Sequence, residues 1–227
     1  MREILHSTGK PPPLYPIFEH LTNFIDDVLC DFKPQSTNKK GDVVNSEDGI
    51  TQDLVRYLND KQEFSKQKIE YPFNFENQTK QDSKRVDIGV RFGRRYTAIN
   101  NALICWIEAK RLPTPNKNKD RDDREYVIVD KKKFNGNGGV QRFKEGEYAP
   151  DLDYSIMIGY MQENDTNHWL SKINGWITDL ADTDNGFWTN EDCLSKYDSN
   201  KCDRFLSIHK RKDIEKPITL HHYWIKL

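Results

Sequence analysis

The sequence has little of three things that mark whole classes of protein: cysteine, net charge and long apolar runs. Four cysteines among 227 residues, all far apart, exclude a small disulfide-stabilised scaffold. A formal net charge of −1 excludes the simplest nucleic-acid-binding proteins, which are basic throughout. Any contact with a polyanion must therefore come from local patches. No run approaches the roughly 20 apolar residues that span a bilayer, which predicts a protein without membrane segments.

What the chain does have is enough aromatic and aliphatic residues for a core. Hydrophobic residues make up 35% and aromatic residues 11%, while 31% are charged. This composition is typical of one globular domain with long polar loops. Residues 1–13 are polar and rich in proline, without the apolar stretch of a signal peptide. We therefore expect a cytoplasmic location in which all four thiols are free.

Hydrophobic periodicity predicts a mixed α and β fold. Helical spacing predicts helices over 18–32, 46–58, 140–148 and 165–180, with Ser46 as an N-cap. Strand patterns are predicted over 68–75, 85–92, 102–107, 154–160, 204–209 and 218–225. We expect a central mixed sheet of about five strands flanked by helices. The single domain 1–227 divides into a core over about 46–160, an N-terminal helix with its lead-in over 1–45, and a C-terminal helix and strands over 161–227.

Two predicted strands carry acidic side chains in a pattern that points to chemistry. Asp87 lies between the apolar residues Val86 and Ile88, where a carboxylate without a partner would be costly to bury. The apolar run 103–107 leads directly into Glu108 and, two residues later, Lys110. Residues two apart on a strand share a face, so adjacent strands would bring both acids and the amine together.

This combination suits metal-assisted hydrolysis of phosphodiesters. Mg²⁺ prefers oxygen ligands and keeps several waters, so one or two carboxylates hold it. The metal polarises a phosphate and lowers the pKa of a bound water. A nearby amine offsets the negative charge that develops on the phosphate.

Asp87, a 20-residue gap and then Glu108-Ala109-Lys110, with an acidic helix upstream, resembles the PD-(D/E)xK nuclease superfamily, which has a restriction-endonuclease-like core. The resemblance spans about half of the chain. It implies that Asp87 and Glu108 bind Mg²⁺ or Mn²⁺ with help from the Ala109 carbonyl. It also implies that Lys110 positions or activates the attacking water.

The same resemblance implies a further acid on the helix before the strands. Glu47 is the best match, and Asp48 and Asp53 are its rivals. Val86 replaces the proline that gives the superfamily its name. Gln141 is a weak accessory catalytic candidate, because Gln141 and Tyr148 are too far apart to match the Gln-then-Tyr motif of one branch.

Basic residues near the predicted sheet edge are candidates for nucleic-acid contact. Arg94 and Arg95 lie at a predicted hairpin tip, and Arg142 follows a glycine-rich turn. The resemblance implies DNA as substrate, with RNA left open, in restriction, anti-phage defence or repair. It also implies a second copy of the chain or a defence-system protein as partner, and no membrane.

Three alternatives stay open. The Glu108–Lys110 pair is also typical of a surface ion pair, with Asp87 capping a turn. A nuclease-like fold also serves as a catalytically inactive nucleic-acid-binding or structural subunit. A glycosidase using Asp87 and Glu108 is the remotest, since such an enzyme does not need Lys110.

Overall fold

The computed structural model describes most of the chain, and its fold is mixed α and β. The residues described are 14–35, 46–64, 72–77, 80–81, 84–93, 102–114, 122, 124–129, 138–183, 186–197 and 202–227. The helices are α1 (Leu14–Val28), η1 (Leu29–Asp31), α2 (Glu47–Phe64), α3 (Gly139–Lys144), α4 (Thr166–Thr183) and η2 (Asn190–Asp192). The strands are β1 (Phe73–Asn77), β2 (Lys80–Gln81), β3 (Lys84–Arg85), β4 (Ile88–Phe92), β5 (Leu103–Leu112), β6 (Tyr154–Met161), β7 (Ser195–Lys196), β8 (Asp203–Arg211) and β9 (Ile214–Lys226).

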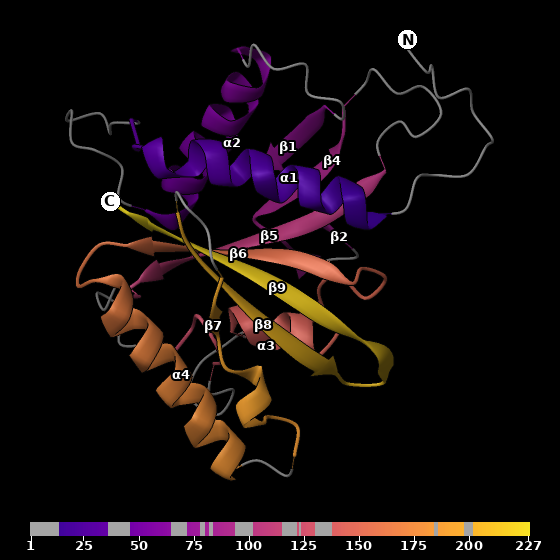
Figure 1. The fold of residues 1–227 in the computed structure, drawn as a ribbon, viewed down its shortest axis with the longest axis vertical. Helices are drawn as coiled ribbons and strands as arrows, with labels where there is room; N and C mark the ends of the chain where they lie inside the picture. Colours follow the sequence, from indigo (N-terminus) through magenta and orange to yellow (C-terminus); the bar gives the residue numbers. More distant parts are fainter. Residues whose placement is uncertain are drawn as a thin grey trace.

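A seven-stranded mixed sheet organises the molecule, in the order β1-β4-β5-β6-β9-β8-β7. The strands β5, β6 and β9 run parallel, and antiparallel pairs extend the sheet on both sides. The expected class is confirmed, with more strands than the five expected. The predicted strands over 204–209 and 218–225 correspond to β8 and β9, and both join the same sheet together with the short β7 (Figure 1).

Helices cover both faces of the sheet, so β5 is buried on both of its faces. Ile107 and Ala109 pack into one core with α1 and α2, and Trp106 and Leu112 pack into another with α3 and α4. The two cores therefore follow the alternation of side chains along this strand. Figure 1 shows α1 and α2 beside β1 and β4, with α4 beyond β7 and β8.

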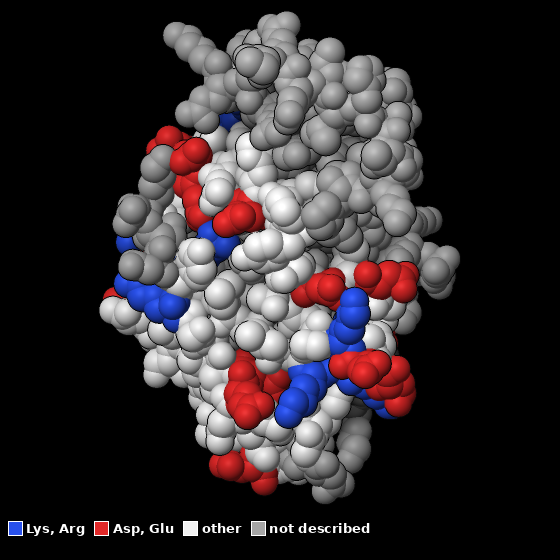
Figure 2. Space-filling view, turned by 45° about the vertical axis from the view of Figure 1, so that its right-hand side comes forward, with Lys and Arg blue, Asp and Glu red and all other residues white. Residues whose placement is uncertain are grey.

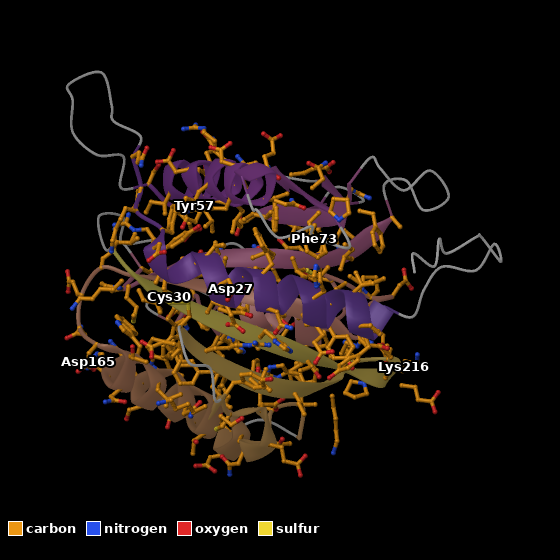
Figure 3. The ribbon with its side chains drawn as sticks, turned by 45° about the horizontal axis from the view of Figure 1, so that its top comes forward. Asp27, Cys30, Tyr57, Phe73, Asp165 and Lys216 are labelled. Carbon is orange, nitrogen blue, oxygen red and sulfur yellow. A yellow bond between two sulfur atoms is a disulfide. The ribbon has the colours of Figure 1, made fainter. Side chains whose placement is uncertain are left out.

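The start of α2 follows the predicted capping chemistry. The Ser46 hydroxyl accepts a hydrogen bond from Gly49 N at 3.1 Å, and α2 begins at Glu47. Further along, the Tyr57 hydroxyl donates to the Val28 carbonyl at 2.7 Å and ties α2 to the end of α1 (Figure 3). The cap thus fixes where α2 begins, and Tyr57 fixes the middle of the helix against the end of α1.

The cysteines correct one expectation. Cys30 and Cys202 form a disulfide between η1 and the residue before β8, while Cys105 and Cys193 are free. The two bonded residues are 172 positions apart in sequence with Cα atoms 5.6 Å apart, so the tertiary fold brings two distant segments together at this point. Disulfides are uncommon in reducing compartments, so the cytoplasmic location stays a prediction. No described helix is both long and apolar enough to cross a membrane.

Candidate active site

The candidate site lies where β4 begins and β5 continues past it. Ile88, the first residue of β4, pairs with Ile107, so the following part of β5 has no β4 residue opposite it. A side chain binds the β5 backbone here instead of a β4 residue. Asp87 Oδ2 accepts a hydrogen bond from Ala109 N at 2.8 Å. Asp87 therefore lies in a bend before β4 and not within a strand, which corrects the sequence-based placement.

A second carboxylate completes this edge from α2. Glu47 Oε2 accepts from Arg111 N at 3.2 Å, two residues beyond Ala109. The backbone N–H groups that a longer β4 would have bound are thus taken by Asp87 and Glu47. Because the N–H and C=O of one strand residue point toward the same neighbour, the Ala109 carbonyl faces the same side as Asp87.

Glu108 and Lys110 project from β5 on the face opposite Ala109. Glu108 is 1% exposed and Lys110 is 5% exposed. The Lys110 Nζ lies 2.9 Å from Glu108 Oε1 and 3.3 Å from Glu47 Oε1. The structure therefore brings Glu47, Asp87, Glu108 and Lys110 together at one sheet edge.

A second cation reaches Glu108 from α3. Arg142 Nη1 donates to Glu108 Oε1 at 3.0 Å and to the Tyr148 hydroxyl at 2.6 Å. The guanidinium also lies over the Tyr148 ring, 5.1 Å from its centroid. From the sequence, Arg142 was expected to contact nucleic acid. Its contact with Glu108 was not predicted, and the only sequence feature that pointed to it is the glycine-rich turn before α3.

That turn explains why α3 lies close to the site. A Cβ on Gly138 would meet the Ile128 Cα at 2.3 Å, so only glycine allows this approach. The first N–H groups of α3 then donate to the segment before it, as when Gly139 N binds the Glu125 carbonyl at 2.9 Å. This packing fixes the direction from which Arg142 reaches Glu108.

Burial and like charge set the protonation of the site. Burial first, and then the neighbouring Glu108 carboxyl, raise the pKa of Asp87 to about 7, against the pull of Lys110 and the Ala109 N–H. Burial alone would lower the pKa of Lys110, but Glu108, Glu47 and Asp87 together hold it well above its ordinary value. Lys110 is therefore an ammonium group at neutral pH.

No family model, curated protein or solved structure matches this chain. The resemblance to PD-(D/E)xK nucleases therefore depends on the residues of the site themselves.

The acids fit a hard divalent cation in one specific respect. Glu108 Oε2 is buried and has no hydrogen-bond partner among the described residues, although the carboxyl is almost fully desolvated. Asp87 faces this carboxyl closely enough to raise its own pKa. A cation between the two carboxyl groups would give Glu108 Oε2 a partner and offset the repulsion that raises the pKa of Asp87. Within the described residues no three His, Cys, Asp or Glu side chains form a complete metal site, so water would supply the remaining ligands of Mg²⁺.

The other candidates are placed elsewhere or outside the described residues. Asp48 is exposed, and Asp53 is turned away, with its carboxyl bound to Gln35 N at 2.9 Å. These contacts leave Glu47 as the α2 acid of the site. Arg94 and Arg95 lie outside the described residues.

Gln141 does not join the acids, because its amide organises the start of α3. Its Oε1 accepts from Gly138 N and Val129 N at 3.3 and 3.4 Å. Its Nε2 donates to Glu145 Oε1 at 2.8 Å. These contacts give Gln141 a structural part in holding the glycine turn.

A second buried polar cluster has the spacing of a Ser–His–Asp group. Asp192 Oδ1 lies 2.7 Å from His209 Nδ1, and Ser207 Oγ lies 2.6 Å from His209 Nε2. All three residues are at most 2% exposed, and Ser207 also contacts His222 Nε2 at 2.7 Å. A serine enclosed in this way is not accessible to a substrate, so the cluster ties η2 to β8 and β9.

Proposed function

We propose that this protein is a nuclease that uses Mg²⁺ or Mn²⁺ to hydrolyse phosphodiester bonds, with DNA as the preferred substrate. The observation that carries the proposal is the convergence of Asp87, Glu108 and Lys110 beside the start of β4. These are the residues on which the resemblance to PD-(D/E)xK nucleases depends. The resemblance also supports a role in restriction, anti-phage defence or repair.

The metal would be held by Asp87 and Glu108, with the Ala109 carbonyl as a further oxygen on the same side. When bound, such an ion polarises the scissile phosphate and lowers the pKa of a coordinated water. The orphaned Glu108 Oε2 and the raised pKa of Asp87 both support this assignment.

Lys110 would act through its charge and not as a base. Its pKa is held well above the ordinary value, so it carries a proton at neutral pH. It would orient the attacking water and offset the negative charge that grows on the phosphate oxygens. Glu47, 3.3 Å from the same ammonium group, would fix its direction.

The face of the molecule in Figure 2 carries charges of both signs. On that face, acidic and basic described side chains lie next to each other, with no large patch of a single sign among them. Binding would therefore depend on a few cations near the site. Among the residues that the structure describes, Arg142 is the candidate for contact with a phosphate. Arg94 and Arg95 are candidates from the sequence alone.

The test is cleavage under defined metal conditions. Linear, circular and single-stranded DNA, and RNA, are incubated with the full chain in Mg²⁺, Mn²⁺ or EDTA, alongside Lys110→Gln. Cleavage is expected only with metal, and Lys110→Gln should lower the rate about 100- to 1,000-fold. Lys216→Gln, which removes a lysine that is 74% exposed, is the control and should cleave like wild type. Cleavage that survives both EDTA and Lys110→Gln would exclude this mechanism.

One observation favours a second candidate, a nuclease-like module that binds nucleic acid without cutting it. Lys110 and Arg142 already neutralise Glu108, as in an ion-pair cluster that needs no metal. The same assay separates the two functions, because the binding module would retain nucleic acid in a filter assay while leaving it intact with every metal.

A further inference from the structure

The two oxygens of the buried Glu108 carboxylate have opposite surroundings. Oε1 contacts two cations, Lys110 Nζ at 2.9 Å and Arg142 Nη1 at 3.0 Å. Oε2 has no hydrogen-bond partner among the described residues. A carboxylate that is 1% exposed needs a counter-charge. In the absence of a metal, the protein supplies that charge from its own side chains.

The two cations differ in how firmly they are held. The side chain of Lys110 is 7% exposed and lies between Glu108 and Glu47. Arg142 is 25% exposed and arrives from another element, α3. Within the described residues, the hydrogen bonds of its guanidinium go to Glu108 and Tyr148 alone. Arg142 is thus the cation with access to solvent.

Its chemistry also suits a second partner. A guanidinium offers five N–H donors in a planar fork, and it binds phosphate oxygens in pairs. The guanidinium of Arg142 donates to the described residues Glu108 and Tyr148 through one terminal nitrogen, Nη1. The Tyr148 ring beneath the guanidinium supports it on one side without neutralising it. A phosphate placed beside the site would compete directly with Glu108 for this group.

We propose that Arg142 is an internal counter-ion that occupies Glu108 until a substrate phosphate takes it over, so that divalent cation and phosphate bind with positive coupling. The inference depends on the proposed function, because it takes Asp87 and Glu108 as the cation site. Without phosphate, Arg142 opposes cation binding at Glu108. With phosphate bound, the guanidinium moves to the phosphate and leaves Glu108 to the cation. By linkage, the cation strengthens phosphate binding by the same factor.

The chain offers a matched control for this arginine. Arg91 is 23% exposed and pairs with Glu76 at 3.1 Å, whereas Arg142 is 25% exposed and pairs with Glu108 at 3.0 Å. Arg91→Gln therefore removes a similarly exposed guanidinium and an ion pair of similar length away from the site, and its partner carboxylate is 36% exposed where that of Arg142 is 1% exposed. Arg142→Lys keeps the charge and serves as the conservative variant.

The experiment measures Mn²⁺ affinity without any cleavage, from the electron paramagnetic resonance signal of free Mn²⁺. The full chain, Arg142→Gln, Arg142→Lys and Arg91→Gln are titrated alone and with a short phosphorothioate DNA duplex. Without DNA, Arg142→Gln should bind Mn²⁺ about 10-fold more tightly than wild type, while the other two variants stay within about twofold. With DNA, wild type should gain about 5- to 50-fold and Arg142→Gln less than about twofold.

Each outcome separates this inference from the proposed function. If wild type binds Mn²⁺ and Asp87→Asn does not, but Arg142→Gln matches wild type or binds more weakly, the counter-ion role is wrong and the metal site stands. If wild type binds no Mn²⁺ with or without DNA, both fail. Circular dichroism of each variant checks folding. If Arg142→Gln does not fold, the wild-type titrations still decide, because the same Mn²⁺ affinity with and without DNA would overturn the coupling.

Discussion

Glu47 and Lys110 are 63 residues apart in the sequence, yet the Lys110 Nζ lies 3.3 Å from Glu47 Oε1. The other oxygen of Glu47 accepts from Arg111 N at 3.2 Å. One carboxylate thus binds both the side chain and the backbone of β5, and it connects the first turn of α2 to the candidate site. This double contact gives Glu47 a positioning role that its neighbours on α2 do not share.

Glu47→Gln should lower the nuclease rate about 10- to 100-fold, because Lys110 keeps one partner but loses its orienting charge. Asp48→Asn is the control, since Asp48 is exposed in the same helical turn. Both changes remove one acid from the start of α2 and weaken the helix-dipole interaction equally. Single-turnover cleavage rates compare them, and equal losses would reduce Glu47 to a helix-terminal charge.

Asp87→Asn should stabilise the metal-free protein at pH 8. Because the folded-state pKa is raised from 3.8 to about 7, protonated Asp87 favours the folded state, and that stabilisation is lost as pH rises from about 4 through 7. Asparagine carries no charge and still accepts from Ala109 N. We expect a gain of about 1–3 kcal/mol at pH 8 and little change at pH 4, measured by urea unfolding in EDTA.

The same variant should lose its response to metal. Mn²⁺ should raise the melting temperature of wild type but not of Asp87→Asn, since ligands stabilise only the state that binds them. Asp48→Asn should respond like wild type. An equal rise in all three proteins would remove Asp87 as a ligand.

Local patterns were enough to predict the parts of the site that lie on neighbouring strands. The spacing of Glu108 and Lys110 determined their common face, and Asp87 was correctly placed beside them, although within the neighbouring strand and not just before it. Ser46 and the acids after it marked the start of α2. These features follow from periodicity and capping, which act over a few residues.

The rest depends on long-range packing that a single sequence does not reveal. The contact of Arg142 with Glu108 depends on Gly138, which lets α3 approach Ile128. The bend at Asp87 arises because its carboxylate binds the β5 backbone in place of a strand. The Cys30–Cys202 disulfide and the joining of β7, β8 and β9 to the central sheet likewise follow from how distant segments meet.

Lys144→Met should destabilise the fold without a direct effect on the site. The Lys144 Nζ lies 2.8 Å from Asp192 Oδ1, with the two side chains 1% and 2% exposed. Removing one partner leaves a buried, uncompensated charge, which costs about 3–5 kcal/mol. Lys216→Met, whose pair with Asp153 is 3.7 Å long and exposed, should change stability by less than about 1 kcal/mol. Urea unfolding of both variants checks the difference, and equal effects would contradict it.

The outer edge of β1 should depend on two amide side chains of α2. Asn59 binds both backbone groups of Phe75, at 3.0 and 3.1 Å, and Gln62 contacts both backbone groups of Phe73. These amides occupy the positions of a neighbouring strand and close an edge that would otherwise pair with another molecule.

Replacing both amides, in Asn59→Ala with Gln62→Ala, should therefore lower stability by about 1–3 kcal/mol and promote self-association. Gln52→Ala is the control, because Gln52 lies exposed on the same helix. Size-exclusion chromatography over a range of concentrations measures association, and urea unfolding measures stability. A double variant that stays as stable and as dispersed as the control would show that β1 needs no cover, whereas early association would identify this edge as the place where α2 keeps the sheet closed.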